Sequence, residues 1–391
     1  MPILRTTGRY VPLSVGGRPL AFVPEALPPV PPLEVDAKLR ARLDAALLAL
    51  GRLDAVSTLL PNPDLFLYSY VRKEALVSSQ IEGTQSSLAD LLLFEVNAAP
   101  GVPFDDVVEV SNYVAALEAG LGRLKGGFPL SNRLIRDMHA ILMRRGRGAD
   151  RQPGEFRRTQ NWVGGASPEE AVFVPPPATE VEPCMAALER FLNDEPERVS
   201  PLVKAGLAHV QFETIHPFLD GNGRLGRLLV ALVLHVEGVL SLPLLYLSLY
   251  FKQRRSEYYD RLGRVRTDGD WEGWMRFFAE GVAETAGNAV STASRLTELA
   301  GRDRERVRAI GRGAATALQV HDAMLREPIT TIPRLAARTH LSVPGATAGL
   351  ERVVALGLAT EVTGRRRGRV YCYAEYVKLL SEGTEPIRLA G

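Results

Sequence analysis

The sequence predicts a mainly α-helical protein with one small β-hairpin in its central part and a winged helix-turn-helix domain at its C-terminal end. Three observations support this fold class. Leucines recur every three or four residues from Leu39 to Leu50, as on one face of a helix. Two short β-prone runs flank a turn rich in Gly, Ser and Pro within residues 153–177. Beyond Gly301, three short helical segments precede a strand, a turn and a second strand.

Length and composition limit the class of protein. The chain has 391 residues, enough for two or three domains. Apolar residues make up 46% and charged residues 24%, which excludes a disordered protein, a fibre and a small disulfide scaffold. The two cysteines, Cys184 and Cys372, lie far apart without metal-ligand spacing, so we expect a reducing compartment and no zinc. The first residues lack the pattern of a signal peptide, and a cytoplasmic location is expected.

The elements before residue 300 follow from local patterns. Residues 1–32 are rich in proline and are predicted to form an extended arm rather than part of the core. Local periodicity and capping residues predict helices from Leu33 onward, after a cap at Asp64, over about 107–121, over 133–143 after the N-cap Ser131, and over 181–193, 201–213 and 224–236.

One apolar stretch, residues 228–251, could be mistaken for a membrane span. It contains His235, Glu237 and Pro243, and its continuous apolar part, Leu228–Leu234, is short. A span needs roughly 18–20 apolar residues. We therefore expect a buried central helix with a neighbouring helix, and no membrane partner.

The C-terminal segment has the element order of a winged helix. Helices are predicted over 315–325, 332–339 and 343–356, and strands over 359–362 and 369–373, around a turn with three arginines that Arg369 follows. Residues 301–391 carry 15 Lys and Arg against 9 Asp and Glu, so DNA is one candidate partner. The expected recognition helix has few side chains able to read base edges, so protein docking and homodimer formation stay open as alternatives.

The most informative run extends from His216 to Arg227. Gly221 and Gly223 let the backbone approach a ligand closely. The run leads directly into an apolar helix, whose free amide groups and positive dipole end favour an anion. Arg224 and Arg227 are three residues apart, so both can reach one phosphate chain.

Two further side chains complete the set of groups that phosphoryl or nucleotidyl transfer needs. Asp220 lies just before the turn and is suited to hold Mg²⁺ against phosphate oxygens. A histidine titrates near neutral pH, so His216 can take a proton from a hydroxyl group. The three glycines also match a dinucleotide-binding loop, but that loop follows a strand, and residues 205–214 are predicted to be helical.

The run His216–Arg227 resembles the signature of Fic-domain proteins, with every fixed position filled. Residues 78–83 resemble the inhibitory motif of the Fic class whose inhibitory helix lies N-terminal in the same chain. Residues 159–162 resemble the family's flap, which docks a target segment by strand addition. The resemblance covers about residues 35–285 and implies a Fic helical core with a β-hairpin flap.

This resemblance implies protein AMPylation, in which AMP passes from ATP to a Ser, Thr or Tyr hydroxyl of a protein and pyrophosphate is released. Carried over by position, His216 deprotonates the hydroxyl and Asp220 binds Mg²⁺. The implied nucleotide-binding residues are those of the loop, the helix start and a tyrosine pair: Gly221, Asn222, Gly223, Arg224, Leu225, Gly226, Arg227, Tyr258 and Tyr259. ATP and Mg²⁺ are the implied cofactors, and the partner is a target protein, which includes the chain itself.

The resemblance also implies autoinhibition. Glu82 would pair with Arg227 and block placement of the γ-phosphate, while Ser78 and Gly83 support the turn. A carboxylate competes directly with a phosphate for one guanidinium. A helix-capping role for Glu82 and ordinary core packing of the tyrosines are the alternatives.

Arg266 departs from the family pattern, because some relatives place there an asparagine that hydrogen-bonds adenine. UTP or another nucleotide is therefore an alternative to ATP. The expected organisation is an N-terminal arm and helical segment with the inhibitory motif (1–100), a Fic catalytic core (101–285), and a linker with the winged helix (286–391). A DNA-binding regulator is the alternative function.

Overall fold

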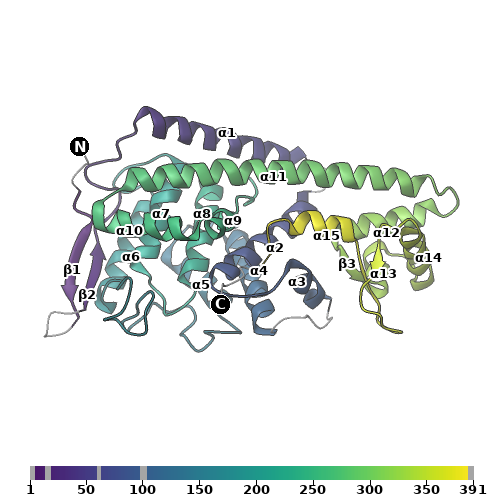
Figure 1. Ribbon diagram of the computed structural model, residues 1–391, viewed down its shortest axis with the longest axis horizontal. Helices are drawn as coiled ribbons and strands as arrows, with labels where there is room; N and C mark the ends of the chain where they lie inside the picture. Colours follow the sequence, from purple (N-terminus) through teal and green to yellow (C-terminus); the bar gives the residue numbers. More distant parts are fainter. Residues whose placement is uncertain (1–4, 14–18, 60–62, 97–103, 386–391) are drawn as a thin grey trace. The chain divides into compact units, whose positions relative to one another are not determined.

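The computed structural model describes residues 5–13, 19–59, 63–96 and 104–385 (Figure 1). The protein is mainly helical, as predicted, with a two-stranded and a three-stranded antiparallel sheet in the described ranges. The chain divides into two compact units, residues 1–54 with 108–287 and residues 55–107 with 288–391. The domain limits expected after residues 100 and 285 stay a prediction.

The first unit is centred on the helices α7 (Pro201–Ile215) and α8 (Asn222–Val236), which pack against each other. Nearly all their side chains are buried, including the run Leu228–Leu234. In Figure 1 this pair lies among the other helices of the unit. These are α5 (Asn132–Leu142), α6 (Ala178–Leu192), α9 (Ser248–Gln253) and α10 (Arg255–Asp268). The pair therefore provides a rigid support for the loop that connects it.

The apolar stretch at residues 228–251 does not form one continuous helix. It divides into the C-terminal part of α8, a loop and the short helix α9. Among the residues that the structure describes, no helix is both long enough and apolar enough to span a bilayer.

The N-terminal segment is not an arm outside the core, so the expectation for residues 1–32 is wrong in its described part. Strand β1 (Gly8–Pro12) pairs with β2 (Leu20–Pro24), and Ala21, Phe22 and Val23 are buried. The prolines end each strand, where the lost N–H matters least. Strand β2 is apolar, but the high proline content of the segment concealed this signal.

The central turn is present, but it contains a single β-bridge instead of a regular hairpin. Val163 and Phe173 exchange two backbone hydrogen bonds of 2.8 and 3.1 Å. Gly164 and Gly165 follow with positive φ and end the pairing. The backbone N–H of Phe22 donates to the carbonyl of Val174 at 3.0 Å, which attaches β2 to this segment. We refer to residues 153–177 as the flap.

The remaining predicted helices are present with shifted limits. They are α1 (Ala37–Leu59), α2 (Pro63–Ile81) and α4 (Phe104–Lys125), together with α5 and α6. Ser131 caps α5 by accepting the N–H of Leu134, as predicted. Asp64, the expected cap residue, lies within the range of α2, which begins at Pro63, where a missing N–H costs nothing.

The second unit contains a small domain near the C-terminal end of the chain. Its elements follow in the order α12 (Ala314–Arg326), β3 (Ile329–Thr331), α13 (Ile332–Thr339), α14 (Val343–Ala355), β4 (Thr360–Glu361) and β5 (Val370–Cys372). The strands form an antiparallel sheet in the order β3-β5-β4. Ser342 caps α14 by accepting the N–H of Gly345. Strand β3 was not predicted, because three residues are too few for a periodic signal.

Besides α10, three further helices have no counterpart among the predicted elements. Two of them are short and belong to the second unit: α3 (Leu88–Glu95) and α15 (Ala374–Ser381). The third, α11 (Trp271–Arg308), has 38 residues and contributes to both units.

Candidate functional site

The run from His216 to Arg227 forms the connection between α7 and α8 and the first turns of α8. His216 and Gly221 both adopt the left-handed conformation, with φ of 49° and 79°. This conformation is uncommon for a residue with a side chain, so surrounding contacts must hold His216. Glycine is required at position 221, because an added Cβ would lie 2.8 Å from Sδ of Met143.

Asn222 stabilises the loop from within. Its Oδ1 accepts the backbone N–H of Phe218 at 2.9 Å, and its Nδ2 donates to the carbonyl of Phe218 at 2.8 Å. The side chain is buried. Asn222 was expected to bind the nucleotide, and this geometry leaves its backbone N–H, not its amide side chain, for that role.

The start of α8 has the features of an anion site. Gly221 is the N-cap residue and provides no side-chain acceptor to the first turn of the helix. Its own N–H donates to Oδ1 of Asp220 at 2.6 Å. An uncapped helix start presents backbone N–H groups and a positive dipole end. Gly223, Leu225 and Gly226 lie within this first stretch of the helix.

Asp220 is a reasonable Mg²⁺ ligand. Its side chain is 44% exposed, and Oδ1 lies 3.6 Å from Arg224. Within the described ranges, no group of three or more His, Cys, Asp or Glu side chains is arranged to hold a metal ion. Mg²⁺ commonly takes one or two protein carboxylates and completes its shell with water and phosphate oxygens. A single partly exposed carboxylate fits that pattern.

The two arginines of the run are both buried. Arg224 donates to Oε2 of Glu109 at 3.1 Å and to Sδ of Met143 at 3.4 Å. Glu109 also accepts from Arg147 at 2.7 Å. Arg227 follows one turn later and contributes to the electrostatic environment of His209.

His209 connects α8 to an aromatic cluster. Its Nδ1 lies 2.9 Å from the carbonyl of Gly226 and its Nε2 lies 2.9 Å from the hydroxyl of Tyr258. Burial lowers the pKa of His209 to about 4, and Arg227 lowers it further against the opposing effect of the Gly226 carbonyl. Tyr258 is buried and stacks on Phe251 at 4.4 Å. Within the tyrosine pair, the exposed ring is that of Tyr259, at 41%.

Arg266 lies over the flap. Its guanidinium is 3.9 Å from the ring centroid of Phe173. Burial lowers the pKa of Arg266 to about 10, which leaves it charged at neutral pH. The residue that departs from the family pattern therefore contacts the flap.

Sequence reasoning missed His139, which contacts the loop from α5. Its Nδ1 accepts the N–H of Gly154 at 2.8 Å, so Nε2 carries the proton and donates to the carbonyl of Asp220 at 2.9 Å. Its ring stacks on Phe218 at 3.7 Å. Burial lowers the pKa of His139 to about 4, so it is neutral. A histidine within the apolar face of the helix predicted at 133–143 was the available signal.

The residues of the inhibitory motif lie at the end of α2 in the second unit. Ser78 is buried, and Glu82 is exposed, with its N–H donating to the carbonyl of Ser79 at 3.0 Å. Gly83 has φ of 104°, a conformation that favours glycine. The geometry agrees with a tight turn after the helix.

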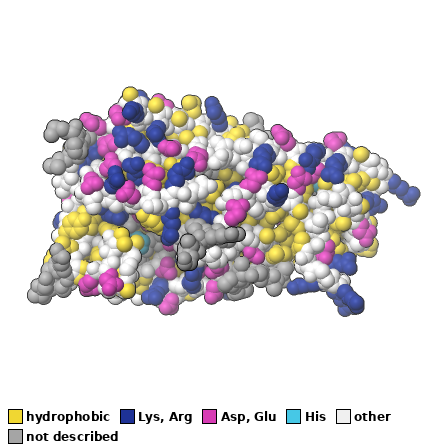
Figure 2. All heavy atoms as spheres, in the orientation of Figure 1, with side chains coloured by type: hydrophobic (Ala, Val, Ile, Leu, Met, Phe, Trp, Pro, Cys, Tyr) yellow, Lys and Arg dark blue, Asp and Glu magenta, His cyan; other side chains and the backbone are white. Residues whose placement is uncertain are grey.

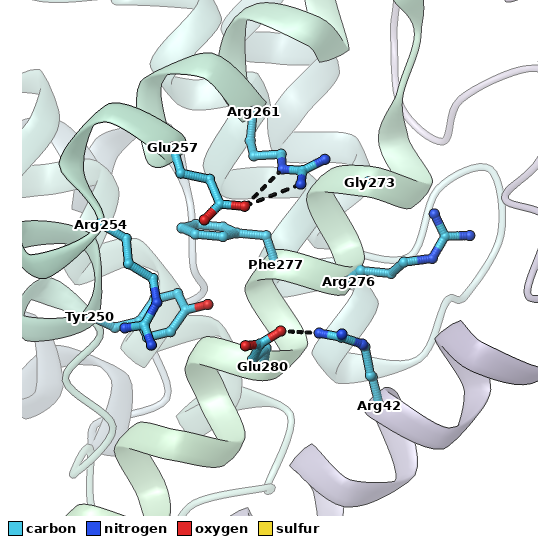
Figure 3. A pocket seen from close by; sticks show the side chains of 9 residues that line it. All are labelled: Arg42, Tyr250, Arg254, Glu257, Arg261, Gly273, Arg276, Phe277 and Glu280. Atoms are coloured by element: carbon cyan, nitrogen blue, oxygen red, sulfur yellow. Dashed lines mark hydrogen bonds and ion pairs between the residues drawn. The ribbon is translucent and has the colours of Figure 1, made fainter.

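A separate cavity of about 300 Å³ lies among α1, α9, α10 and α11 (Figure 3). Its four arginines suggest an anion site, but each has a carboxylate partner: Arg42 pairs with Glu280, Arg254 with Glu284, Arg261 with Glu257, and Arg276 with Asp36. These pairs offset the positive charge of the arginines, and the cavity is not assigned a ligand.

Comparison with known families assigns two regions of the chain. Residues 40–122 match the Fic/DOC family N-terminal domain, and residues 129–234 match the Fic/DOC family. The protein adenylyltransferase Fic of Drosophila erecta is 32% identical over 208 residues, which are 52% of this chain and 39% of the relative. That of Drosophila willistoni is 30% identical over 259 residues, 64% of this chain and 47% of the relative. The chain spans less than half the length of these relatives.

Solved structures have the same fold. A Fic family protein from Desulfovibrio desulfuricans superposes with a TM-score of 0.58 at 22% identity, covering 87% of this chain and 97% of the other. A Fic domain containing signaling protein from Bacteroides thetaiotaomicron gives a TM-score of 0.51 at 22% identity, covering 66% and 97%. The chain therefore contains a region that matches the Fic/DOC family N-terminal model, at residues 40–122, and a region that matches the Fic/DOC family model, at residues 129–234, and it has the fold of the solved Fic proteins.

Proposed function

We propose that the protein transfers AMP from ATP to a Ser, Thr or Tyr hydroxyl of a target protein and releases pyrophosphate. The observation that carries this proposal is the placement of His216 at the end of α7, joined by one short loop to the uncapped start of α8. A proton acceptor and an anion site are thereby held in one rigid segment. Relatives named protein adenylyltransferase support the same chemistry.

His216 is the proposed base. Its Nδ1 lies 3.3 Å from the carbonyl of Glu213, and a carbonyl can only accept, so Nδ1 carries the proton. Nε2 is then the atom that accepts the hydroxyl proton. The hydroxyl oxygen bonds to the α-phosphorus, the bond from the α-phosphorus to the β-bridging oxygen breaks, and pyrophosphate leaves with that electron pair.

The phosphate groups of the nucleotide are proposed to bind at the start of α8. The backbone N–H groups of residues 222–224 would bind phosphate oxygens, and Arg224 and Arg227 would add charge there. Asp220 would hold Mg²⁺, which neutralises phosphate charge when bound. Tyr259 is the exposed member of the tyrosine pair proposed for the base-binding side. Arg266 makes UTP an alternative nucleotide.

The flap is the proposed docking site for the target chain. Its exposed apolar side chains, Trp162 and Val172, are suited to an extended peptide. One edge of the flap is already bound by the chain itself, through the hydrogen bond from Phe22 to Val174. We therefore expect a target strand to add at the edge that carries Trp162.

Autoinhibition by Glu82 is part of the proposal. The residue is exposed at the end of α2, and it precedes Gly83, which has a positive φ. A carboxylate that reaches Arg227 would exclude a phosphate from the same guanidinium.

The test uses ATP labelled on the α-phosphate with wild type, Glu82→Gly and His216→Ala. Label on protein in Glu82→Gly, with little in wild type and none in His216→Ala, would support transfer and inhibition together. UTP labelled in the same way tests the alternative nucleotide. Nucleotide binding to His216→Ala, measured by calorimetry, serves as the folding control. Transfer by His216→Ala at the rate of its parent would remove the residue from the role of base.

DNA binding by a C-terminal winged helix is the second candidate function. The order α12, β3, α13, α14, β4, β5 and the sheet order β3-β5-β4 support that fold. In Figure 2, Lys and Arg side chains gather at the tip of the turn between β4 and β5. In the described part of the chain, no carboxylate lies within ion-pair distance of Arg365, Arg366 or Arg367, so these arginines can meet phosphates.

Salt dependence tests this candidate. The slope of log affinity against log salt concentration should decrease by about 0.9 for each phosphate contact removed. We expect this change for alanine at Arg365, Arg366 and Arg367. Alanine at three exposed basic residues elsewhere in the segment, Arg312, Arg326 and Lys378, is the matched control. Equal slopes for both triple variants, or no binding by wild type, would exclude the turn as a DNA-binding wing.

A further inference from the structure

Arg157 is a buried arginine at the base of the flap. Its side chain is among the largest that are fully buried in the protein, with 2% of the residue exposed. Its hydrogen-bond partners in the described structure are backbone carbonyl groups, without a carboxylate. A buried charge of this kind is costly unless several acceptors compensate it.

The guanidinium connects the flap to the loop between α7 and α8, residues 216–221. Nε donates to the carbonyl of His216 at 2.9 Å, and one terminal nitrogen lies 3.4 Å from the carbonyl of Ile215. The same nitrogen donates to the carbonyl of Pro176 at 2.5 Å. The other terminal nitrogen lies 3.4 Å from the carbonyl of Thr159. One side chain therefore binds both ends of the flap and the two residues at which α7 ends.

The backbone of Arg157 reinforces this connection. Its N–H donates to the carbonyl of Pro217 at 2.9 Å. Three consecutive carbonyls, those of residues 215, 216 and 217, thus accept from one arginine. Hydrogen bonds from a charged donor are roughly twice as strong as neutral ones.

Among these acceptors, the carbonyl of His216 matters most for the conformation of the loop. His216 is held in the left-handed conformation, which costs a residue with a side chain on the order of 1–3 kcal/mol. Asn161 adds a second contact to this carbonyl at 3.4 Å and donates to Phe218 at 2.8 Å. Without Arg157, rotation of the peptide after His216 would lose its strongest restraint.

We propose that Arg157 is a positioning residue of the transfer reaction: it holds the backbone of His216 in its left-handed conformation and fixes the flap base at a set distance from it. Its replacement should slow the chemical step while nucleotide binding stays intact. The kinetic part of this inference, a slower chemical step, rests on the proposed function. Its structural part, that Arg157 fixes the flap and the backbone of His216, rests on the contacts alone.

The experiment compares Arg157→Met, Arg157→Lys and Arg158→Met in the Glu82→Gly background. Arg158 is the exposed neighbour and provides a matched control. For Arg157→Met we expect kcat to fall about 100-fold, with KM for the nucleotide within twofold of the parent. Arg157→Lys keeps the charge but not the fork, and should recover part of that loss.

Hydrogen exchange gives a readout that does not need transfer. The amides of Val163 and Phe173, which form the β-bridge of the flap, should exchange at least tenfold faster in Arg157→Met than in Arg158→Met. If Arg157→Met does not fold, the same comparison is made with Arg157→Lys, which retains a charged donor. Unchanged flap exchange overturns the structural part of the inference. A rise in the KM of Arg157→Met at constant kcat overturns the kinetic part. If the Glu82→Gly parent itself shows no transfer, the proposed function is overturned instead.

Discussion

The carboxylate of Glu109 and the guanidinium of Arg224 lie 3.1 Å apart, and both side chains are only 3% exposed. Glu109 comes from α4 and Arg224 from the first turn of α8, so the pair joins two distant segments of the chain. Breaking a buried ion pair by removing one partner leaves an uncompensated charge.

We therefore expect Glu109→Ala to lower the free energy of unfolding by roughly 3–5 kcal/mol. Urea unfolding of wild type and variant measures this difference. Arg147, which bonds the same carboxylate from a half-exposed position, offers the control, and Arg147→Ala should cost roughly 1 kcal/mol or less. Equal costs for the two variants would contradict a special role for the buried pair.

The buried histidines make stability depend on pH. In His139 and His209 the pKa falls from 6.5 to about 4, chiefly through burial. The unfolded chain therefore binds more protons between these values, and the free energy of unfolding decreases as the pH falls below 6.5. The loss reaches about 3 kcal/mol per histidine near pH 4, and neither histidine contributes a pH dependence above 6.5.

Unfolding of wild type and His139→Gln at pH 7.5, 6.5, 5.5 and 4.5 isolates this effect, because the carboxylates are common to both proteins. The difference in unfolding free energy between the two should shrink as the pH decreases. A constant difference over this range would mean that His139 does not titrate on unfolding.

Asn222 should control the rate more strongly than nucleotide affinity. Asn222→Ala removes the acceptor of the Phe218 N–H and one of the two donors to the Phe218 carbonyl, which loosens the loop, so we expect kcat to fall about 100-fold. Asn222→Asp keeps the acceptor for the Phe218 N–H and should retain more activity. Steady-state kinetics of labelled transfer checks this order, and a rise in KM alone would assign Asn222 to substrate binding.

Glu82→Gly should raise auto-AMPylation roughly 10–100-fold, the factor expected when a competing charged hydrogen bond of about 1.5–3 kcal/mol is removed. Glu82→Gln, which keeps the size of the side chain without its charge, should give an intermediate rate. If both variants label at the wild-type rate, the glutamate is a structural residue of the turn.

The sequence predicted those features of the fold, such as helix limits and caps, that depend on residues close together in the chain. Helix α13 begins and ends at the predicted residues, Ile332 and Thr339, and Ser131 caps α5 as expected. These features arise from hydrogen bonds within one helical turn. The glycines and charges of the run after His216 were visible for the same reason.

The partners of that run could not be found in this way. Glu109 lies 115 residues from Arg224, His139 lies 81 residues from Asp220, and Arg157 lies 59 residues from His216. Local periodicity carries no information about such separations. Only the packing of α4, α5 and the flap around the loop brings these groups together.

The left-handed residues at both ends of the loop have a further consequence. They let α7 end and α8 begin within six residues, so the carbonyl end of one helix and the amide end of the next are close neighbours. These two ends have opposite electrostatic sign. A positive imidazolium on His216 would sit beside the negative end, and a polyphosphate beside the positive end. The backbone alone thus provides a local field that favours the separation of charge produced when a proton and a pyrophosphate move apart.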